Sequence, residues 1–184
     1  MTTDNSESLD REARLALGTQ RLDALPEADA EAALRACCGS STWVRAMLAR
    51  RPFATPARVF EAADEVWSHA TEDDWLEAFR AHPRIGESKA APTQSATAAS
   101  WSKNEQAGVA KTTDEVRARL AAVNAAYEAR YGFIYIVCAT GRSAPEMLAL
   151  AESRMTSDRA SELRVAAGEQ AKITRIRLEK LLQS

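Results

Sequence analysis

Alanine is the most frequent residue in this chain, and its abundance constrains the fold more than any other feature of the sequence. The 184 residues include 38 alanines but only 7 glycines and 6 prolines. Alanine is the best helix former, whereas glycine and proline interrupt helices. Apolar residues make up 46% of the chain, which is enough to bury a core. We therefore expect an all-α fold, a single-domain bundle of about seven to nine helices.

Capping residues and helical spacing predict where the helices begin and end. Pro56 suits a first helical position after Thr55, and Gly132 suits the position just past a helix end. Residues 1–12 are polar and expected to fray, so residues 1–25 form an N-terminal extension before a helical domain over 26–184. Residues 83–100 are expected to form a loop. The expected helices cover about 28–38, 41–50, 56–70, a short stretch between Thr71 and Pro83, 101–111, 114–131, 144–155 and 158–182.

One apolar run, FIYIVC at residues 133–138, does not fit the helical pattern. Periodicity allows either an isolated extended segment or a buried turn of helix. A lone strand has no partner, so we interpret the run as an extended stretch that crosses a helical core. Its backbone polar groups would then be partly available to a ligand.

Charge and cysteine content narrow the partners and the compartment. The net charge is −2, with −5 in residues 1–92 and +3 in residues 93–184, and no basic cluster of the kind that neutralises nucleic-acid phosphates. A small anionic ligand is compatible with this distribution. No apolar stretch predicts a secretory signal or membrane association. The three cysteines, two of them adjacent, do not suggest disulfides, so we expect a cytoplasmic protein.

The usual cofactor and metal motifs are missing from the sequence. No glycines follow a phosphate-binding pattern, and two histidines thirteen residues apart without C-x-x-C do not form a metal ligand set. The stretch CATGRS resembles a cysteine phosphatase loop, but Arg142 follows Cys138 by four residues where six are needed. We therefore expect no metal, no cofactor and an inert Cys138 thiol.

Four groups of polar residues are candidates for a functional site. His82 precedes Pro83 at a helix exit, whereas His69 is expected to interact with the carbonyls at a helix end. Ser102, Glu105 and Gln106 share one helical face, which spacing alone would also allow to be solvated. Arg177 lies on an expected buried face, where it either pairs with a carboxylate or extends its stem to water. The other members of that face are Leu163, Ala166, Gln170, Ile173 and Leu181.

Several motifs together resemble one known family. HPRIGE, S-x-x-E-Q and the later GF segment form a specific set, although each alone would be weak. From about Leu34 to Leu182 the chain resembles 2-oxo-4-hydroxy-4-carboxy-5-ureidoimidazoline (OHCU) decarboxylase, which completes the conversion of uric acid to (S)-allantoin. The matching segments are CCGS at 37–40 with Trp43 and Met47, RPF at 51–53, DWLEAFRAHPRIGE at 74–87, SKNEQAG at 102–108, YGFIYIVCA at 131–139 and KITRIRL at 172–178.

The resemblance implies an activity and a set of site residues. The activity is a carboxy-lyase reaction without a cofactor, on a small anionic ureidoimidazoline. His82, Glu105 and Arg177 match the catalytic residues. The residues that match substrate contacts are Pro83, Ser102, Gln106 and the stretch Tyr135, Ile136, Val137, Cys138 and Ala139. Apolar helix faces that are left exposed are easily covered in a homodimer, so we also expect a homodimer.

The chain departs from the family in one stretch, which keeps two other functions open. Where the family reads G-F-P-F, this chain reads G-F-I-Y, so the Tyr135 hydroxyl is expected at the pocket rim. This change motivates a related ureide or imidazolone enzyme, for example a hydrolase, which would not turn over OHCU. A non-catalytic helical binding module is the other alternative, and it would bind ligand unchanged after His82→Ala.

Overall fold

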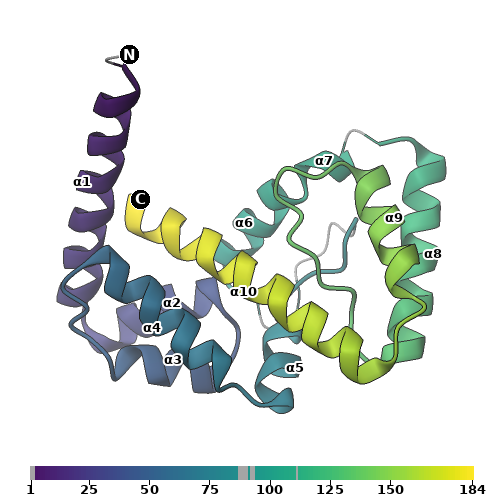
Figure 1. The fold of residues 1–184 in the computed structure, drawn as a ribbon, viewed down its shortest axis with the longest axis horizontal. Helices are drawn as coiled ribbons and strands as arrows, with labels where there is room; N and C mark the ends of the chain where they lie inside the picture. Colours follow the sequence, from purple (N-terminus) through teal and green to yellow (C-terminus); the bar gives the residue numbers. More distant parts are fainter. Residues whose placement is uncertain (1–2, 87–90, 92–93, 111) are drawn as a thin grey trace. The chain divides into compact units, whose positions relative to one another are not determined.

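The computed structural model describes residues 3–86, 91, 94–110 and 112–184, and this part of the chain contains ten α-helices and no β-strand. The all-α prediction is confirmed. The number of helices exceeds the expected seven to nine, because α1 is not among those expected and the helix expected at 101–111 is divided between α6 and α7. The helices, labelled in Figure 1, are α1 (Thr3–Ala24), α2 (Glu27–Cys37), α3 (Ser41–Leu48), α4 (Pro56–Ser68), α5 (Glu72–Arg80), α6 (Ala96–Glu105), α7 (Ala107–Ala110), α8 (Asp114–Tyr131), α9 (Ala144–Arg154) and α10 (Arg159–Gln183).

The chain divides into two compact units, which we describe separately. The first unit contains the residues up to Asp74 together with Ile173–Ser184, and the second contains Trp75–Lys172. Helices α5 and α10 therefore contribute residues to both units. The expectation of one helical domain over residues 26–184 after an N-terminal extension stays a prediction.

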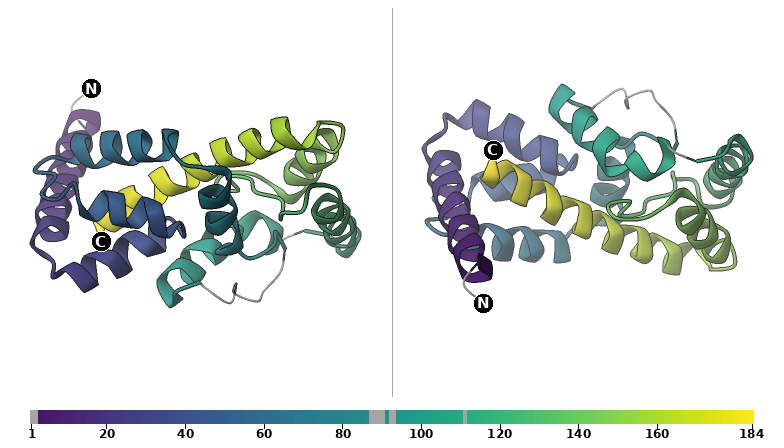
Figure 2. Two further views of the ribbon diagram at one scale, coloured as in Figure 1. Left: turned by 90° about the horizontal axis from the view of Figure 1, so that it is seen from below. Right: turned by 90° about the horizontal axis from the view of Figure 1, so that it is seen from above.

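The core of the first unit is formed by short helices that follow one another in the sequence. Helix α2 packs against α3, α3 against α4, and α1 against α4 (Figure 2). Leu34, Trp43, Val44, Met47 and Val59 are each at most 1% exposed. Because burying a large apolar side chain contributes about 1.5–3 kcal/mol, this cluster is a main source of stability for the unit.

The expectation that residues 1–12 fray is wrong for residues 3–12, because α1 begins at Thr3, whereas residues 1–2 lie outside the described residues. Arg11 forms an ion pair with Glu179 of α10 at 2.5 Å, and Leu15 is buried. A Cβ atom added to Gly18 would lie only 1.8 Å from the carbonyl oxygen of Leu182, so glycine permits a very close approach of the two helices. The helix is thus held by partners more than 160 residues away, which the local sequence does not reveal.

Two side chains around the turn from α4 to α5 have structural roles. The Nδ1 of His69 lies 2.9 Å from the Glu65 carbonyl at the end of α4, which confirms the role expected for this histidine. At the start of α5, Asp74 accepts hydrogen bonds from the backbone N–H and the hydroxyl of Thr71, at 2.9 and 2.7 Å. Partial burial opposes these hydrogen bonds, but they prevail and lower the pKa of Asp74 below its usual value.

The predicted loop at residues 83–100 is too long at its C-terminal end. Helix α6 begins at Ala96, where the Ser95 hydroxyl accepts a hydrogen bond from the Ala98 N–H at 3.2 Å. This serine is an ordinary N-cap signal, hidden in a run of small residues. Residues 87–90, 92–93 and 111, which belong to the predicted loop and to the next predicted helix, lie outside the described residues.

The second unit contains an aromatic cluster where α8 meets the stretch that follows it. The ring centroid of Tyr127 lies 4.7 Å from that of Tyr131, 5.8 Å from that of Phe133 and 5.3 Å from that of Tyr135. Phe79 of α5 contacts Phe133 at 5.6 Å. Residues 134–139, here called the extended segment, are neither helix nor strand and connect α8 to the start of α9 (Figure 1). The helical alternative for this run is therefore excluded.

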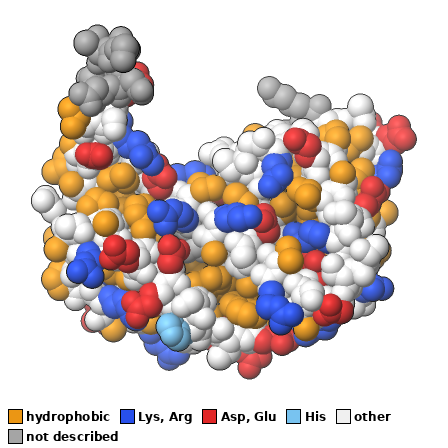
Figure 3. Space-filling model, viewed as in Figure 1, with side chains coloured by type: hydrophobic (Ala, Val, Ile, Leu, Met, Phe, Trp, Pro, Cys, Tyr) orange, Lys and Arg blue, Asp and Glu red, His pale blue; other side chains and the backbone are white. Residues whose placement is uncertain are grey.

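The surface carries charges of both signs. On the face shown in Figure 3, basic and acidic side chains are interspersed and no continuous basic area is visible. Among the residues that the structure describes, no helix combines the length and the apolar character needed to cross a lipid bilayer.

Candidate active site

His82 lies just past the end of α5, in the second unit. Its backbone N–H donates to the Phe79 carbonyl at 3.0 Å, which closes a last tight turn before Pro83. Phe79 in turn contacts Phe133, so the helix exit is packed against the residue that precedes the extended segment. The His82 side chain is half-buried. The predicted position of this histidine at a helix exit is confirmed.

The residues after His82 are held by helix α8. Arg84 forms two hydrogen bonds with the carboxylate of Glu128, at 2.9 and 3.0 Å. The Ile85 carbonyl accepts a hydrogen bond from Nδ2 of Asn124 at 2.8 Å. Two-point pairing of a guanidinium with a carboxylate restricts orientation as well as distance. The loop is therefore fixed on α8 immediately after the candidate catalytic histidine.

Three of the predicted site residues lie on α6 and at its C-terminal end, and they face the protein rather than solvent. Ser102 is 4% exposed, and its hydroxyl accepts a hydrogen bond from Nε2 of Gln94 at 2.7 Å. Glu105 and Gln106 are half-buried. The Gly86 N–H donates to Oε1 of Gln106 at 2.9 Å, so this glutamine joins the end of α6 to the loop after His82. The alternative of a fully solvated face is wrong.

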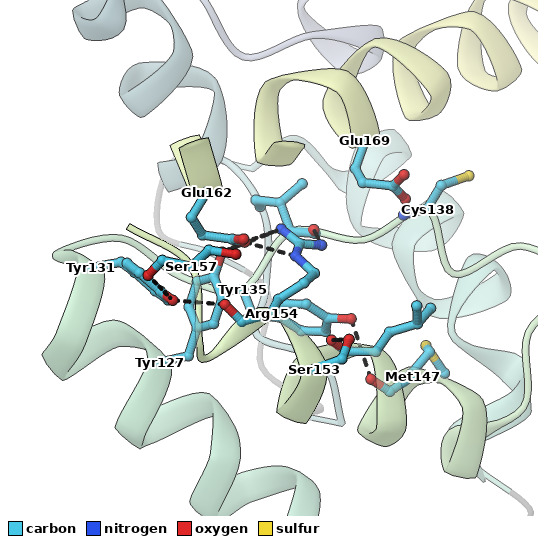
Figure 4. Close-up of polar contacts among 12 residues, drawn as sticks. Tyr127, Tyr131, Tyr135, Cys138, Met147, Ser153, Arg154, Ser157, Glu162 and Glu169 are labelled. Carbon is cyan, nitrogen blue, oxygen red and sulfur yellow. Dashed lines mark hydrogen bonds and ion pairs between the residues drawn. The ribbon is translucent and has the colours of Figure 1, made fainter. Parts of the chain in front are cut away.

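No strand lies beside the extended segment in the part of the chain that the structure describes, and side chains satisfy part of its backbone (Figure 4). The Ile136 carbonyl accepts a hydrogen bond from Nη1 of Arg154 at 2.9 Å. The Cys138 N–H donates to Oε2 of Glu169 at 2.8 Å, and the Cys138 carbonyl accepts from Nε of Arg142 at 3.2 Å. The backbone groups expected to be available to a ligand are thus partly occupied by the protein itself.

The position of Tyr135 corrects the expectation that its hydroxyl reaches the pocket rim. The residue is only 2% exposed, and its hydroxyl donates to the Met147 carbonyl at 3.2 Å (Figure 4). Burial raises the pKa of Tyr135 to about 12, despite the nearby Arg154 cation, which acts to lower it. The ring points inward because it packs with the aromatic cluster, which the local pattern did not indicate.

Behind the extended segment, Arg154 and Glu162 form a buried ion pair (Figure 4). The side chain of Glu162 is fully buried, and Nε of Arg154 donates to its Oε1 at 2.7 Å. Tyr127 donates a short hydrogen bond to the same carboxylate. Burial and this hydrogen bond raise the pKa of Tyr127, so the phenol stays protonated. The guanidinium carbon of Arg154 also lies 4.9 Å from the Tyr135 ring centroid, at cation–π distance.

The electrostatic surroundings of Cys138 support the expectation of an inert thiol. Burial is the largest cause of its raised pKa, and the negative charges of Glu169 and Glu105 raise it further. A thiol with a raised pKa is mostly protonated at neutral pH and is a poor nucleophile. The same effect shows that Glu105 lies near the extended segment. The other two cysteines, Cys37 and Cys38, are buried and form no disulfide.

Arg177 lies in the first unit, on the predicted buried face of α10. It is 3% exposed, which excludes the alternative that its head group reaches water. Its Nη1 lies 3.4 Å from the Ala36 carbonyl. The role of Arg177 beside His82 stays a prediction, because the two residues belong to different units.

The first unit contains a cavity of about 190 Å³, which we consider a less suitable active site than the surroundings of His82. Its polar groups have structural partners, since His69 contacts the Glu65 carbonyl and Asp74 binds Thr71. It is lined by Thr42, Trp43, Ala46, Arg50, Val66, His69, Ala70 and Asp74. Within the described ranges, no three His, Cys, Asp or Glu side chains are grouped as metal ligands.

The structure of the second unit thus connects several predicted site residues and adds others. It joins the loop after His82 to Gln106, and it brings Glu105 near Cys138. Sequence reasoning missed Arg154 and Glu169, which hold the extended segment. Glu169 could have been suspected in the same way as Arg177, because it lies on a largely buried side of α10.

Comparisons with known proteins agree on one family. Residues 23–179 match the family model described as OHCU decarboxylase. The chain is 35% identical over 147 residues to the uric acid degradation bifunctional protein TTL of Arabidopsis thaliana, covering 80% of this chain and 45% of the relative. It is 32% identical over 87 residues to 2-oxo-4-hydroxy-4-carboxy-5-ureidoimidazoline decarboxylase of Amia calva, covering 47% of this chain and 50% of the relative.

A solved structure supports the same family, and the match covers a larger share of that protein than in the two relatives above. The crystal structure of an OHCU decarboxylase in the presence of (S)-allantoin matches with a TM-score of 0.71 and 35% identity. That match covers 82% of this chain and 96% of the solved chain. By contrast, the chain spans about half the length of the two curated relatives named above.

Proposed function

This chain belongs to the OHCU decarboxylase family, and on that basis we propose that it converts 2-oxo-4-hydroxy-4-carboxy-5-ureidoimidazoline to (S)-allantoin and CO2. It would act as a carboxy-lyase in the degradation of uric acid. The family match covers residues 23–179 and therefore includes every candidate site residue.

The observation that carries the proposal is the way in which the chain holds His82. The loop after this histidine is fixed to α8 by Arg84 and Ile85 and to the end of α6 through Gly86. The histidine itself is half-buried and directly precedes this anchored loop. A general acid or base is effective when it is positioned within hydrogen-bond reach of the reacting proton.

The reaction requires few groups, and this chain offers a residue for each. When CO2 leaves, the electron pair stays on the ring carbon, and hydrogen-bond donors aimed at the developing charge lower the barrier. His82 transfers a proton to or from the substrate hydroxyl and ring region, because imidazole titrates near neutral pH. Glu105 orients His82 or a substrate N–H, and Arg177 supplies positive charge to the substrate carboxylate or to Glu105.

The remaining contacts position the substrate. Ser102 and Gln106 hold the ureido and ring amides, Pro83 packs against the ligand, and the backbone of residues 135–139 binds it. The oxygen of the Gln106 amide accepts from the Gly86 N–H, which restrains the orientation of the amide group. An (S) product requires protonation from one face, so these contacts must fix the orientation of the ring.

We propose further that the enzyme needs no metal or organic cofactor, is a homodimer and resides in the cytoplasm. The homodimer is supported by exposed apolar side chains, Leu9 and Leu17 on α1 and Val165 on α10. The three cysteines are not disulfide-bonded, which suits a reducing compartment. Activity that survives dialysis against a chelator would support the absence of a metal. Light scattering after size-exclusion chromatography tests the homodimer.

The proposed function is tested by a time course with freshly generated OHCU, followed by the circular dichroism of the allantoin that forms. We expect the wild type to produce one enantiomer rapidly and His82→Ala to fall to the spontaneous rate. His69→Ala is the matched control, because His69 is exposed and interacts with a helix end. It should keep full activity.

Two results would contradict the proposal. If the wild type leaves the spontaneous, racemic rate unchanged, the chain does not decarboxylate OHCU, and a related ureide or imidazolone should be tried as substrate. If ligand binding and turnover both survive His82→Ala, the histidine is not catalytic.

A further inference from the structure

The backbone polar groups along one edge of the extended segment have hydrogen-bond partners, whereas most of those along the other edge have none in the described part of the chain. In extended backbone, the polar groups of alternate residues point to the same edge. The contacts with Arg154, Glu169 and Arg142 all go to Ile136 and Cys138, two residues of the same parity. Side chains therefore take the place of a neighbouring strand along one edge.

The other edge is formed by the backbone of Tyr135 and Val137. These residues are 2% and 4% exposed, and no backbone hydrogen bond from either is found among the described residues. Buried backbone N–H and C=O groups are nearly always paired, because leaving them unpaired is costly. A ligand with adjacent N–H and C=O groups, such as a cyclic ureide, could pair with this edge as an added strand would.

Glu169 is the side chain best placed to control the orientation of the segment. It lies on α10, a regular helix, and is 9% exposed. One carboxylate oxygen accepts the Cys138 N–H at 2.8 Å, and the other accepts Nζ of Lys172 at 2.5 Å. Burial acts to raise the pKa of Glu169, but the hydrogen bonds from Lys172 and Cys138 lower it below its usual value. The carboxylate is therefore ionised and is a strong acceptor.

We propose that Glu169 is a positioning residue of this site: by accepting the Cys138 N–H, it fixes the extended segment so that the backbone of Tyr135 and Val137 faces the ureide. Glu169 does not touch the substrate and acts only through the segment. The inference rests on the proposed function for its kinetic test, but not for its structural test.

The experiment compares three substitutions of Glu169 with a matched control. Glu169→Ala removes the acceptor, Glu169→Asp keeps the charge but shortens the reach, and Glu169→Gln keeps an acceptor oxygen without the charge. Glu152→Ala is the control, because Glu152 forms an exposed ion pair with Arg119 in the same unit, at 2.6 Å. For each folded variant we would measure kcat, KM, the enantiomeric excess of allantoin, and hydrogen exchange of the Cys138 amide by NMR.

Glu169→Ala removes the acceptor that holds the Cys138 N–H, so it should lower kcat/KM by about tenfold or more. The loss should appear mainly as a higher KM, together with a lower enantiomeric excess, because the ring is oriented less strictly. The Cys138 amide should exchange faster in Glu169→Ala and Glu169→Asp. Glu169→Gln should recover most of the binding and protection, and Glu152→Ala should resemble the wild type.

Other results would overturn the proposal. It is wrong if Glu169→Ala keeps the KM, the enantiomeric excess and the amide protection of the wild type. It is also wrong if Glu169→Gln and Glu169→Ala lose activity equally, because the charge would then matter rather than the acceptor. If Glu169→Ala does not fold, Glu169→Asp decides the same question. If the wild type does not act on OHCU, the proposed function fails, and Cys138 exchange still decides whether Glu169 holds the segment.

Discussion

Replacing Arg154 by methionine should destabilise the protein more than any surface substitution. In the native protein, Glu162 is fully buried and Arg154 is its cationic partner, with 12% of the arginine side chain exposed. Removing one member of a buried ion pair typically costs about 3–5 kcal/mol, because the other charge stays buried without compensation. The substitution also leaves the Ile136 carbonyl without its donor, which costs about 1–3 kcal/mol.

Methionine fills much of the arginine stem volume, so a cavity adds little, and the two losses together give a total of about 4–8 kcal/mol. At about 2–4 °C per kcal/mol for a chain of this size, the melting temperature should fall by at least about 8 °C and by up to about 32 °C. Urea unfolding, followed by far-ultraviolet circular dichroism and by tryptophan fluorescence, measures the loss.

Two further variants separate this cause from a general packing defect. Arg119→Met breaks an exposed ion pair with Glu152 and should cost at most about 1 kcal/mol. Arg154→Met combined with Glu162→Leu removes both charges and should be more stable than Arg154→Met alone. A loss below about 1 kcal/mol for Arg154→Met, or a double variant no more stable than the single one, would refute this reasoning.

Three other substitutions test separate parts of the structure. Gly18→Ala should lower the melting temperature, because the new methyl group would clash with the backbone of Leu182. Gly168→Ala should instead raise stability by up to about 1 kcal/mol, because nothing lies within 4 Å of the added methyl group and alanine favours the helix. Tyr135→Phe should cost about 1 kcal/mol in urea unfolding and leave kcat/KM unchanged, because the Tyr135 hydroxyl donates to the Met147 carbonyl of α9. A large loss of activity would instead indicate that the hydroxyl lies at the pocket rim. Asp74→Ala should cost about 1 kcal/mol of unfolding free energy at neutral pH. The difference from wild type should vanish as the pH falls through the lowered pKa of Asp74, because the hydrogen-bonded carboxylate stabilises the fold only while it is ionised. A stability difference that persists at pH 2 would contradict this.

The sequence alone determined most of the helices and the position of the candidate histidine, because these features depend on local information. Thr55 with Pro56 begins α4, and Gly132, at a φ of 78°, ends α8 in the left-handed conformation that glycine tolerates. The proline after His82 limits α5 in the same local way. Helical periodicity also identified the buried face of α10 that carries Arg177.

The tertiary structure decided the features whose causes lie far apart in the chain. Helix α1 is held by Glu179 and Leu182, and its polar N-terminal sequence alone suggests fraying. Tyr135 points inward because its ring packs against the aromatic cluster. Glu169 meets the Cys138 amide 31 residues away. Capping and periodicity report on a few neighbouring residues, whereas a side chain that satisfies a distant backbone group leaves no local pattern, so only folding reveals the partner.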